Sequence, residues 1–456
     1  MKRKSYHQLL DWKNAPSRKP LIIRGARQVG KTHLIKEFGQ KEFTRCHYFN
    51  FETDRSLHEI FAKDFFVDRI LGELSLKIRQ DIDAEKDVVI FDEIQDCPRA
   101  LTALKYFCEN KSGLALLCAG SLLGVKLSHE SFPVGKVDFL DLHPMTFTEF
   151  LLALQDQHAL KALQQSITQL EISTTAHNLL QERLKEYYFV GGMPEVVHIY
   201  AESNLPPVQK KELVRKTQKN LIDSYHKDFA KHSGKVNSVQ IVSVFENTPL
   251  QLSQNRDDSV KRYHFKDVLP NKRGYSELKG PIDWLVQAGL LIKVKIANQA
   301  ELPLDAFCKE NIFKLFVFDI GILSCMLDLP VETLMNDNYG IAKGYFSENF
   351  VATQLFACGF YQLHAWQERN SEIEFLQRFD NRLIPLEVKS GKKTQAKSLK
   401  QFILKQAPDL AIMITGTAMQ IKDKQIVQKI SLYQVEYLRE IVSGISVKLN
   451  LNGLPS

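Results

Sequence analysis

A short glycine-containing loop between an apolar run and a helix-forming segment constrains this sequence most. Residues 20–38 read PLIIRGARQVGKTHLIKEF, and the loop follows the pattern G-x-x-x-x-G-K-[ST]. The apolar residues 21–23 predict a strand. After the loop, Leu34, Ile35 and Phe38 fall on one helix face. A strand, a phosphate-binding loop and a helix in this order predict a parallel α/β sheet with an anion site at its edge.

The residue types of the loop match what binding of a nucleotide phosphate requires. Gly25 and Gly30 allow backbone N–H groups to turn toward phosphate oxygens at the positive end of the following helix. Lys31 would reach the β- and γ-phosphates of ATP, and the hydroxyl of Thr32 would bind Mg²⁺. We therefore expect the whole loop to bind ATP. The predicted residues are Gly25, Ala26, Arg27, Gln28, Val29, Gly30, Lys31 and Thr32.

A second apolar run ends in two carboxylates. Residues 87–93 read DVVIFDE, which is typical of a strand buried on both faces of a parallel sheet, and ligands bind at the carboxyl end of such strands. Asp92 would hold Mg²⁺ through water, and Glu93 would act as the general base on the attacking water. The alternative is a solvated acidic helix cap, which the phosphate-binding loop disfavours.

Three further apolar runs extend the predicted sheet, over residues 47–51, 114–119 and 137–142. The middle run leads to Ser121, whose hydroxyl would lie between the carboxylates and the γ-phosphate and could respond to hydrolysis. We place Ser121 with Lys31 and Glu93 in the predicted catalytic set, with a plain turn serine as the alternative.

The middle of the chain is helical by pattern. Residues 154–229 predict several helices, with a sharp break at Gly191-Gly-Met-Pro194. Residues 281–296 predict a short amphipathic helix, opened at its first turn by Pro281, and then a strand.

The last third carries a second chemical cluster. Residues 344–355 predict a helix with Glu348 near its start, and two strands follow, joined by a hairpin-like turn at 379–382. Alternate residues of a strand project from the same face, so Glu387 and Lys389 should lie together, with Glu374 on the neighbouring strand. Because the pattern E-x-K is common, the alternative interpretation is an ion pair on the surface of a strand.

The charge of the chain is concentrated near this cluster. The sequence has 60 Lys and Arg against 53 Asp and Glu, a net +7. Residues 378–429 hold 11 of these basic residues and only 4 acidic ones, so this segment carries the whole excess. An anionic partner, DNA or another nucleic acid, is therefore favoured. The phosphate-binding rim for this partner would consist of Lys392, Lys393, Lys397 and Lys400. The alternative is that these lysines form a solvated helix face.

Several classes of protein are disfavoured. The N-terminal residues lack the apolar stretch of a secretory signal, and the longest charge-free run, 349–367, is too polar for a membrane span. The seven cysteines form no C-x-x-C pair and are expected to be reduced thiols. We expect a cytoplasmic protein with no membrane partner, and a homo-oligomer is an open alternative.

Six motifs resemble one family. They are RGARQVGKT (24–32), IFDEIQ (90–95), GSLLG (120–124), LHPMTFTEF (142–150), YFVGGMPEV (188–196) and KLFVFDIGI (314–322). Together they are similar to the AAA-superfamily ATPases of bacteria and archaea that are fused to a nuclease-like C-terminal domain of unknown function. The family usually has Gly-Arg before its fifth strand, where this chain has Gly135-Lys136; we do not count Lys136 as catalytic.

The resemblance implies an α/β fold with four parts. These are a P-loop AAA-type ATPase core (1–155), a helical lid or connector (156–230), a winged-helix module (231–305) and a restriction-endonuclease-like α/β domain (306–456). A winged helix can place a helix in a DNA groove, and residues 261–266, Lys272 and Arg273 supply basic and aromatic side chains nearby. The alternative is that this module only packs between domains.

For the C-terminal cluster, the resemblance is to the PD-(D/E)XK nuclease core. Glu348, Glu374 and Glu387 would then be ligands of a second Mg²⁺, and Lys389 would orient water and offset charge on the scissile phosphate. The nuclease-like catalytic set is thus Glu374, Glu387 and Lys389. The family more often has Asp at position 374, and the extra methylene of Glu374 shifts the carboxylate by about a bond length, whereas active sites tolerate about 0.5 Å.

The sequence therefore predicts a Mg²⁺-dependent ATPase that couples ATP binding and hydrolysis to a nuclease-like, nucleic-acid-facing effector domain. One alternative is an ATP-dependent nuclease that cleaves at the C-terminal cluster. The other is a nucleotide-switched regulator that binds DNA or protein through an inactive nuclease fold.

Overall fold

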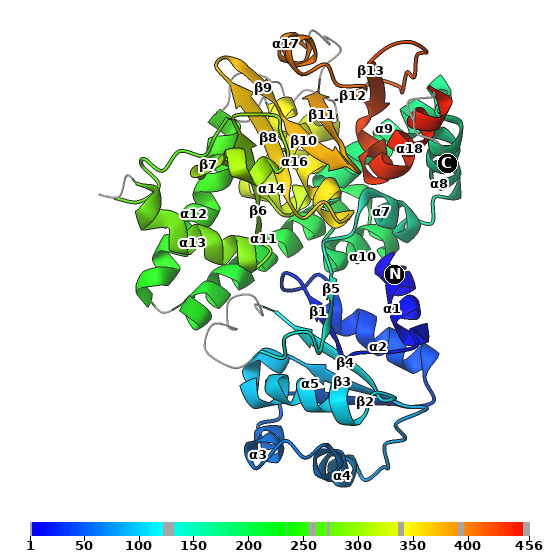
Figure 1. The fold of residues 1–456 in the computed structure, drawn as a ribbon, viewed down its shortest axis with the longest axis vertical. Helices are drawn as coiled ribbons and strands as arrows, with labels where there is room; N and C mark the ends of the chain where they lie inside the picture. The colour runs from blue at the N-terminus through cyan, green and yellow to red at the C-terminus, as the bar shows by residue number, and fades with distance from the viewer. Residues whose placement is uncertain are drawn as a thin grey trace. The chain divides into compact units, whose positions relative to one another are not determined.

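The computed structural model describes residues 2–121, 132–233, 235–254, 261–270, 274–335, 342–390 and 396–449. The chain divides into two compact units (Figure 1). The first, here the N-terminal unit, comprises residues 2–143 with 287–289, and the second, the C-terminal unit, comprises 144–286 and 290–456. Within the described residues, no helix combines the length and apolar character that crossing a membrane requires.

The N-terminal unit is built on a five-stranded parallel sheet of order β2-β3-β4-β1-β5. Its strands are β1 (Leu21–Arg24), β2 (Cys46–Asn50), β3 (Val88–Asp92), β4 (Ala115–Gly120) and β5 (Asp138–Asp141). Its helices are α1 (Ser5–Asn14), α2 (Lys31–Glu42), α3 (Ser56–Ala62), α4 (Val67–Ile78), η1 (Ile94–Asp96) and α5 (Pro98–Asn110). All five predicted strands are confirmed, with ends that shift by one residue. Strand β4 lies between β1, which precedes the loop, and β3, whose end carries the carboxylates.

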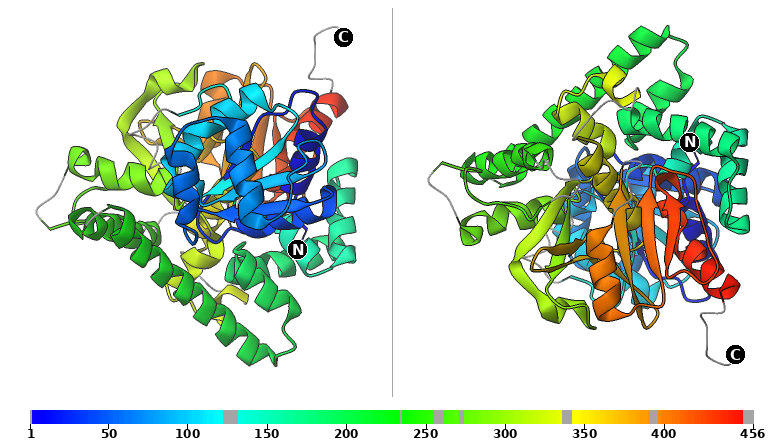
Figure 2. Two further views of the ribbon diagram at one scale, coloured as in Figure 1. Left: turned by 90° about the horizontal axis from the view of Figure 1, so that it is seen from below. Right: turned by 90° about the horizontal axis from the view of Figure 1, so that it is seen from above.

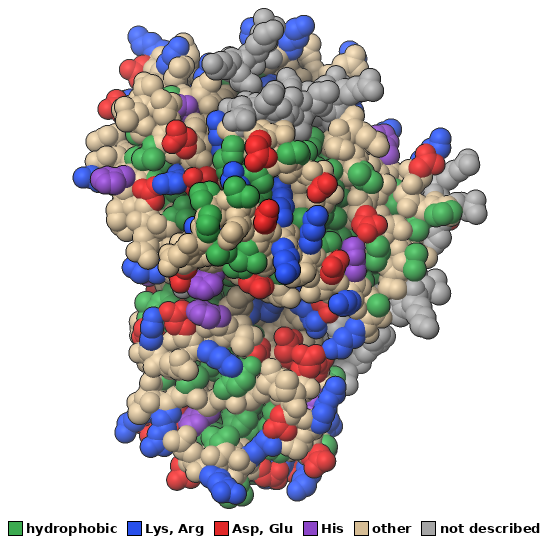
Figure 3. All heavy atoms as spheres, turned by 180° about the vertical axis from the view of Figure 1, so that it is seen from behind, with side chains coloured by type: hydrophobic (Ala, Val, Ile, Leu, Met, Phe, Trp, Pro, Cys, Tyr) green, Lys and Arg blue, Asp and Glu red, His purple; other side chains and the backbone are tan. Residues whose placement is uncertain are grey.

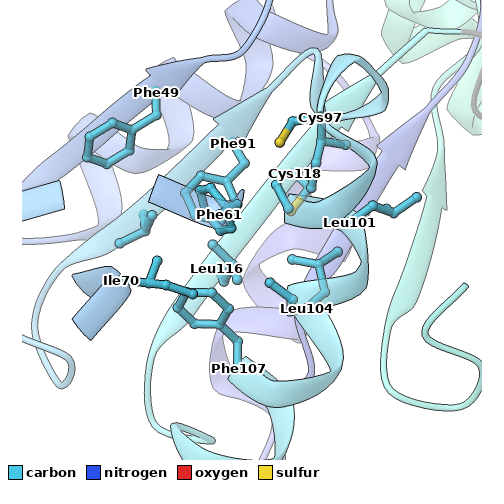
Figure 4. Close-up of a cluster of buried hydrophobic side chains, with 14 of the residues drawn as sticks. Phe49, Phe61, Ile70, Phe91, Cys97, Leu101, Leu104, Phe107, Leu116 and Cys118 are labelled. Carbon is cyan, nitrogen blue, oxygen red and sulfur yellow. The ribbon is translucent and has the colours of Figure 1, made fainter. Parts of the chain in front are cut away.

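The core on one side of this sheet is rich in phenylalanine (Figure 4). The residues of β3 and β4 are all buried, as the continuous apolar runs predict for central strands. The ring of Phe91 lies at the centre of the cluster, 5.4–6.2 Å by centroid from four other phenylalanines in edge-on contacts. Burial of Phe91 therefore stabilises the strand whose end carries Asp92.

In the C-terminal unit, a helical region comes first. Its helices are α7 (Phe147–Ala153), α8 (Gln157–Gln169), α9 (Thr174–Val190), α10 (Pro194–Glu202), α11 (Pro207–Ser233), α12 (Lys235–Gln254) and α13 (Tyr275–Gln287). The predicted break after α9 is confirmed. A Cβ on Gly192 would lie 2.1 Å from the carbonyl oxygen of Met145, and the Gly192 N–H donates to the buried carboxylate of Asp319 over 2.6 Å. No larger residue fits this close approach.

The prediction that Pro281 opens a helix is wrong. Helix α13 begins at Tyr275, and Pro281 lies inside it. Pro281 lacks the backbone N–H that would donate to the carbonyl oxygen of Glu277, in the first turn of the helix. Burial of Leu278, Ile282 and Leu285 on one face offsets that loss, which is about 3 kcal/mol for a proline inside a helix.

Two four-stranded sheets follow, and Figure 2 draws their strands in colours from yellow-green (β6 and β7) to orange-red (β13). One has the order β7-β6-β8-β9, with β6 (Leu291–Ala297), β7 (Cys308–Val317), β8 (Leu363–Glu368) and β9 (Ser371–Ile373). The other has the order β10-β11-β12-β13, with β10 (Phe375–Phe379), β11 (Arg382–Lys389), β12 (Ala411–Thr415) and β13 (Val427–Ser431). The remaining elements are η3 (Leu304–Phe307), α14 (Ile320–Met326), α15 (Val331–Met335), α16 (Ala342–Ala357), α17 (Lys397–Gln406), η4 (Leu432–Tyr437) and α18 (Leu438–Lys448).

The predicted C-terminal hairpin is confirmed. Strands β10 and β11 pair in antiparallel fashion, and Asp380 in their turn has a left-handed φ of 52°. Strands β11, β12 and β13 are parallel, and α17 makes the first crossover. The strand predicted around Glu374 is divided at that residue, which follows the end of β9 and precedes β10. This division gives Glu374 a position between two strand segments.

We predict that Phe91→Ala lowers the free energy of unfolding of the N-terminal unit by about 3–5 kcal/mol, because it leaves a cavity among rings that cannot collapse fully. Urea unfolding followed by circular dichroism measures this. The matched control is Phe66→Ala, whose ring is 72% exposed and whose loss should cost less than about 0.5 kcal/mol. Equal losses for the two variants would contradict the assigned core.

Candidate functional site

The loop between β1 and α2 surrounds the ammonium group of its own lysine. Lys31 is the first residue of α2, and its Nζ donates to the carbonyl oxygens of Gly25 at 2.9 Å and Ala26 at 2.8 Å. Gly30 and Gln28 have left-handed φ values of 94° and 64°, which turn the loop toward the helix N-terminus. Backbone N–H groups and a cation therefore share one end of α2.

Gly25 allows the loop to approach β5 closely. Its φ is 149°, and a Cβ at this position would lie 2.1 Å from the carbonyl oxygen of Leu142. The Leu142 N–H also donates to the carbonyl of Arg24 over 2.8 Å. Any side chain at Gly25 would displace the loop from the end of the sheet.

Two acidic residues lie at the carboxyl end of β3, at the same edge of the sheet. The Oδ2 atom of Asp92 accepts hydrogen bonds from the hydroxyls of Thr32 at 2.9 Å and Tyr48 at 2.6 Å. The hydroxyl of Ser121 donates to Oε2 of Glu93 over 3.4 Å, and Nε of Arg27 donates to that hydroxyl over 3.2 Å. These side chains come from the loop, from the start of α2, from β2 and from the carboxyl ends of β3 and β4, and the strand order brings them together.

Burial changes the protonation of Lys31. The side chain is almost completely buried, and the loss of water around the ammonium lowers the pKa of Lys31 to about 8, although Glu93 and Asp92 oppose this shift. An anion bound beside the ammonium would raise that pKa and stabilise the charged form.

Tyr48 is a site residue that sequence reasoning missed. Burial and its hydrogen bond to Asp92 raise the pKa of the Tyr48 hydroxyl, so it remains a donor at neutral pH. Asn50 donates to the same hydroxyl over 3.1 Å, and Lys36 lies 3.5 Å from the ring centroid. Strand alternation places Tyr48 and Asn50 on one face of β2, but the sequence does not show that β2 adjoins β3.

The predicted C-terminal cluster also comes together. The ammonium of Lys389 lies 3.0 Å from a carboxylate oxygen of Glu387 and 3.3 Å from one of Glu374. The other oxygen of Glu374 accepts the Val388 N–H over 3.1 Å. Glu374 and Glu387 are buried, and burial together with the neighbouring Glu374 charge raises the pKa of Glu387, while Lys389 opposes this.

A second lysine, which sequence reasoning missed in this role, extends the cluster. Lys314 in β7 is fully buried and lies 3.4 Å from the carboxylate of Glu348 in α16. It also forms an ion pair with Glu372 in β9. Burial alone would lower the pKa of Lys314, but the charges of Glu372, Glu348 and Glu374 raise it above its usual value. Four carboxylates and two ammonium groups thus form one network with an excess of negative charge.

The basic residues of the predicted rim are only partly described. Lys397 and Lys400 are exposed on α17, whereas Lys392 and Lys393 lie outside the described residues, as do Lys272, Arg273 and residues 122–124. Lys136 pairs with Glu109 at 2.9 Å. On the face shown in Figure 3, basic and acidic side chains are intermingled.

Comparison with known families identifies the class of the first domain. Residues 17–151 match the model of a family described as an AAA domain. Together with the parallel sheet and the loop geometry, this match shows that the chain contains an AAA-type P-loop ATPase domain. Residues 181–333 and 343–435 match two further models, each described as a domain of unknown function (DUF8612 and DUF4143).

Solved structures of other ATPases were also compared with the chain. The Walker-type ATPase paby2304 of Pyrococcus abyssi is 12% identical, with a TM-score of 0.45, and the match covers 72% of this chain and 95% of that one. The RuvB Holliday junction branch migration motor of Thermotoga maritima is 15% identical, with a TM-score of 0.31, over 64% of this chain and 89% of that one. No curated protein matches the sequence. The domain assignment therefore rests on the family model.

We predict that Lys314→Met lowers the free energy of unfolding by about 3–5 kcal/mol at neutral pH, because it leaves buried carboxylates without their ammonium partner. The deficit should shrink as the pH falls, since protonation removes the unpaired charge. The control is Lys405→Met, which breaks an exposed pair with Glu368 and should cost less than about 1 kcal/mol. Equal, pH-independent losses in urea unfolding would contradict this account of the network.

Proposed function

We propose that the AAA domain hydrolyses ATP with Mg²⁺ at the edge formed by the β1–α2 loop and the ends of β3 and β4. The observation that carries this proposal is the hydrogen bond of 2.9 Å between the Thr32 hydroxyl and the Asp92 carboxylate, beside the Lys31 ammonium. A hydroxyl and a carboxylate are hard oxygen donors of the kind that Mg²⁺ prefers, so the residues fit that cofactor. When bound, Mg²⁺ would neutralise charge that develops on the β- and γ-phosphate oxygens.

The phosphates would be held by the loop itself. Backbone N–H groups of residues 25–30 and the positive end of α2 attract anions, and Lys31 would exchange its two carbonyl partners for phosphate oxygens. The two carbonyl oxygens would thus stabilise the buried ammonium group until phosphate oxygens replace them.

Glu93 is the proposed general base. Its carboxylate accepts a hydrogen bond from Ser121 over 3.4 Å and another from the side chain of Gln95, and these contacts orient it. Glu93 would take a proton from the attacking water, and Ser121 would hold the carboxylate in place and respond to loss of the γ-phosphate. Ser121 and Lys31 complete the proposed catalytic set.

We expect Glu93→Gln to keep ATP binding but to lower turnover by about 10²–10⁴-fold, because the amide cannot accept the proton. Lys31→Ala should lose binding as well. Phosphate release and titration with a fluorescent ATP analogue measure the two steps, and Glu85→Gln, an exposed acid of the same unit, is the control. Undiminished turnover in Glu93→Gln would reject its role, and normal hydrolysis in Lys31→Ala would reject the site.

We further propose that the C-terminal unit contains a nuclease-like effector that faces nucleic acid. Two observations support this proposal: the order of helix α16, strands β8 to β11, helix α17 and strand β12, and the convergence of Glu348, Glu374, Glu387 and Lys389 on one network. The carboxylates supply the hard oxygen donors that a second Mg²⁺ would require, and the excess negative charge of the network would favour a divalent cation. Lys314 lies outside the PD-(D/E)XK pattern.

A basic cavity supports nucleic acid as the partner. The segment after α12 and the helix itself line a cavity of about 530 Å³ in the proposed winged-helix module. Its charged lining is mostly basic, with one carboxylate, and consists of Lys261, Arg262, His264, Lys266 and Asp267. Gln251 fixes this segment by exchanging hydrogen bonds with the backbone N–H and carbonyl of His264. Cationic groups on a fixed backbone suit contacts with phosphates.

The two alternatives differ in whether the C-terminal cluster cleaves. Incubation with Mg²⁺, ATP and plasmid or single-stranded DNA separates them. Cleavage that Lys389→Ala abolishes would support an ATP-dependent nuclease, whereas binding that weakens steeply with salt, without cleavage, would support a nucleotide-switched regulator. Lys405→Ala, on exposed α17, is the matched control. Absence of both binding and cleavage would reject a nucleic-acid partner.

A further inference from the structure

Three side chains with different metal-binding chemistry meet beside the sheet that contains β6. They are Asp305 in η3, Cys308 at the start of β7 and His364 in β8. One ligand atom from each, a carboxylate oxygen, a thiol sulfur and a ring nitrogen, lies within 4.8 Å of the others. Nε2 of His364 and Oδ1 of Asp305 are 3.0 Å apart.

The sheet register brings these residues together. Strand β6 lies between β7 and β8, with Ala297 opposite Cys308 and Lys295 opposite His364. The short helix η3 leads directly into β7, so Asp305 lies three residues before Cys308. His364 comes from a strand that is distant in the sequence, and only the pairing of β6 with both neighbours completes the group.

We propose that Asp305, Cys308 and His364 form a zinc site. Thiolate, imidazole and carboxylate are the ligands that zinc takes in proteins, whereas Mg²⁺ and Ca²⁺ avoid sulfur. Nitrogen and oxygen ligands about 2.1 Å from a tetrahedral metal lie about 3.4 Å from each other, so the 3.0 Å between Nε2 and Oδ1 would have to widen by about 0.4 Å. Three protein ligands would leave the fourth position to water.

A lysine competes with the metal for Asp305. The ammonium of Lys295 lies 2.7 Å from Oδ1, so zinc must share or displace this ion pair. The Lys295 side chain is 45% exposed and can move into solvent. Its positive charge also repels a metal ion. Removal of the ammonium should therefore strengthen zinc binding, whereas removal of any ligand should weaken it.

Cobalt(II) titration of the full chain tests the proposal, because a cobalt–thiolate bond gives a charge-transfer absorption that oxygen ligands do not. The ATP site and the glutamate cluster contain no cysteine, so this signal reports the proposed site even if both proposed functions fail. We expect one equivalent of Co²⁺ to produce the band and one equivalent of Zn²⁺ to abolish it.

Variants assign the signal to named residues. Cys308→Ser should abolish the band, and Asp305→Asn and His364→Gln should each lower zinc affinity by at least about tenfold, since even outer-shell partners contribute that much. Lys295→Gln should raise the affinity. The control is Cys358→Ser, because this half-buried thiol donates to the Glu436 carbonyl over 3.2 Å and lies outside the cluster.

Three outcomes would contradict the zinc site. Absence of a charge-transfer band in the wild-type chain would reject the site, as would a band that persists in Cys308→Ser or disappears in Cys358→Ser. Circular dichroism and urea unfolding of each variant identify loss of folding. If His364→Gln does not fold, Asp305→Asn, whose side chain is 43% exposed to water, provides the same test.

Discussion

The carboxylate of Asp92 is the junction on which the candidate ATP site depends. It ends the buried strand β3 and accepts hydrogen bonds from Thr32 at the start of α2 and from Tyr48 in β2. Three segments that are far apart in the sequence are therefore aligned at one oxygen atom. The phenylalanine cluster around Phe91 fixes the strand directly before it, so packing of the core and geometry of the site are linked through adjacent residues.

The two candidate sites are built on different physical principles. In the AAA domain, the backbone of the loop and the end of α2 form the proposed anion site, together with a single buried lysine. In the C-terminal unit, charged side chains form the candidate site and only partly neutralise one another in the interior. A buried network of this kind stabilises the fold only while each charge keeps its partner, which makes it sensitive to single substitutions.

Sequence reasoning predicted the strands of the AAA domain, the loop and the C-terminal hairpin, because each has a local pattern: a continuous apolar run, a glycine motif or strand alternation. It failed at Pro281, where buried leucine and isoleucine side chains outweigh the local cost of proline in a helix. It also missed Tyr48 and Lys314, because no local pattern shows which strands become neighbours. The domain boundaries and the roles of the site residues stay predictions.

The sequence by itself determined the type of chemistry available at each site, since residue types and short spacings specify phosphate binding by the loop and an acid–lysine cluster near Glu387. Only the tertiary structure decided which groups share a site. It placed β4 between β1 and β3, joined Lys314 to Glu348 and Glu372, and brought His364 to Asp305 and Cys308. The physical reason is that strand order and register depend on burial of apolar faces across the whole sheet, whereas motifs depend only on neighbouring residues.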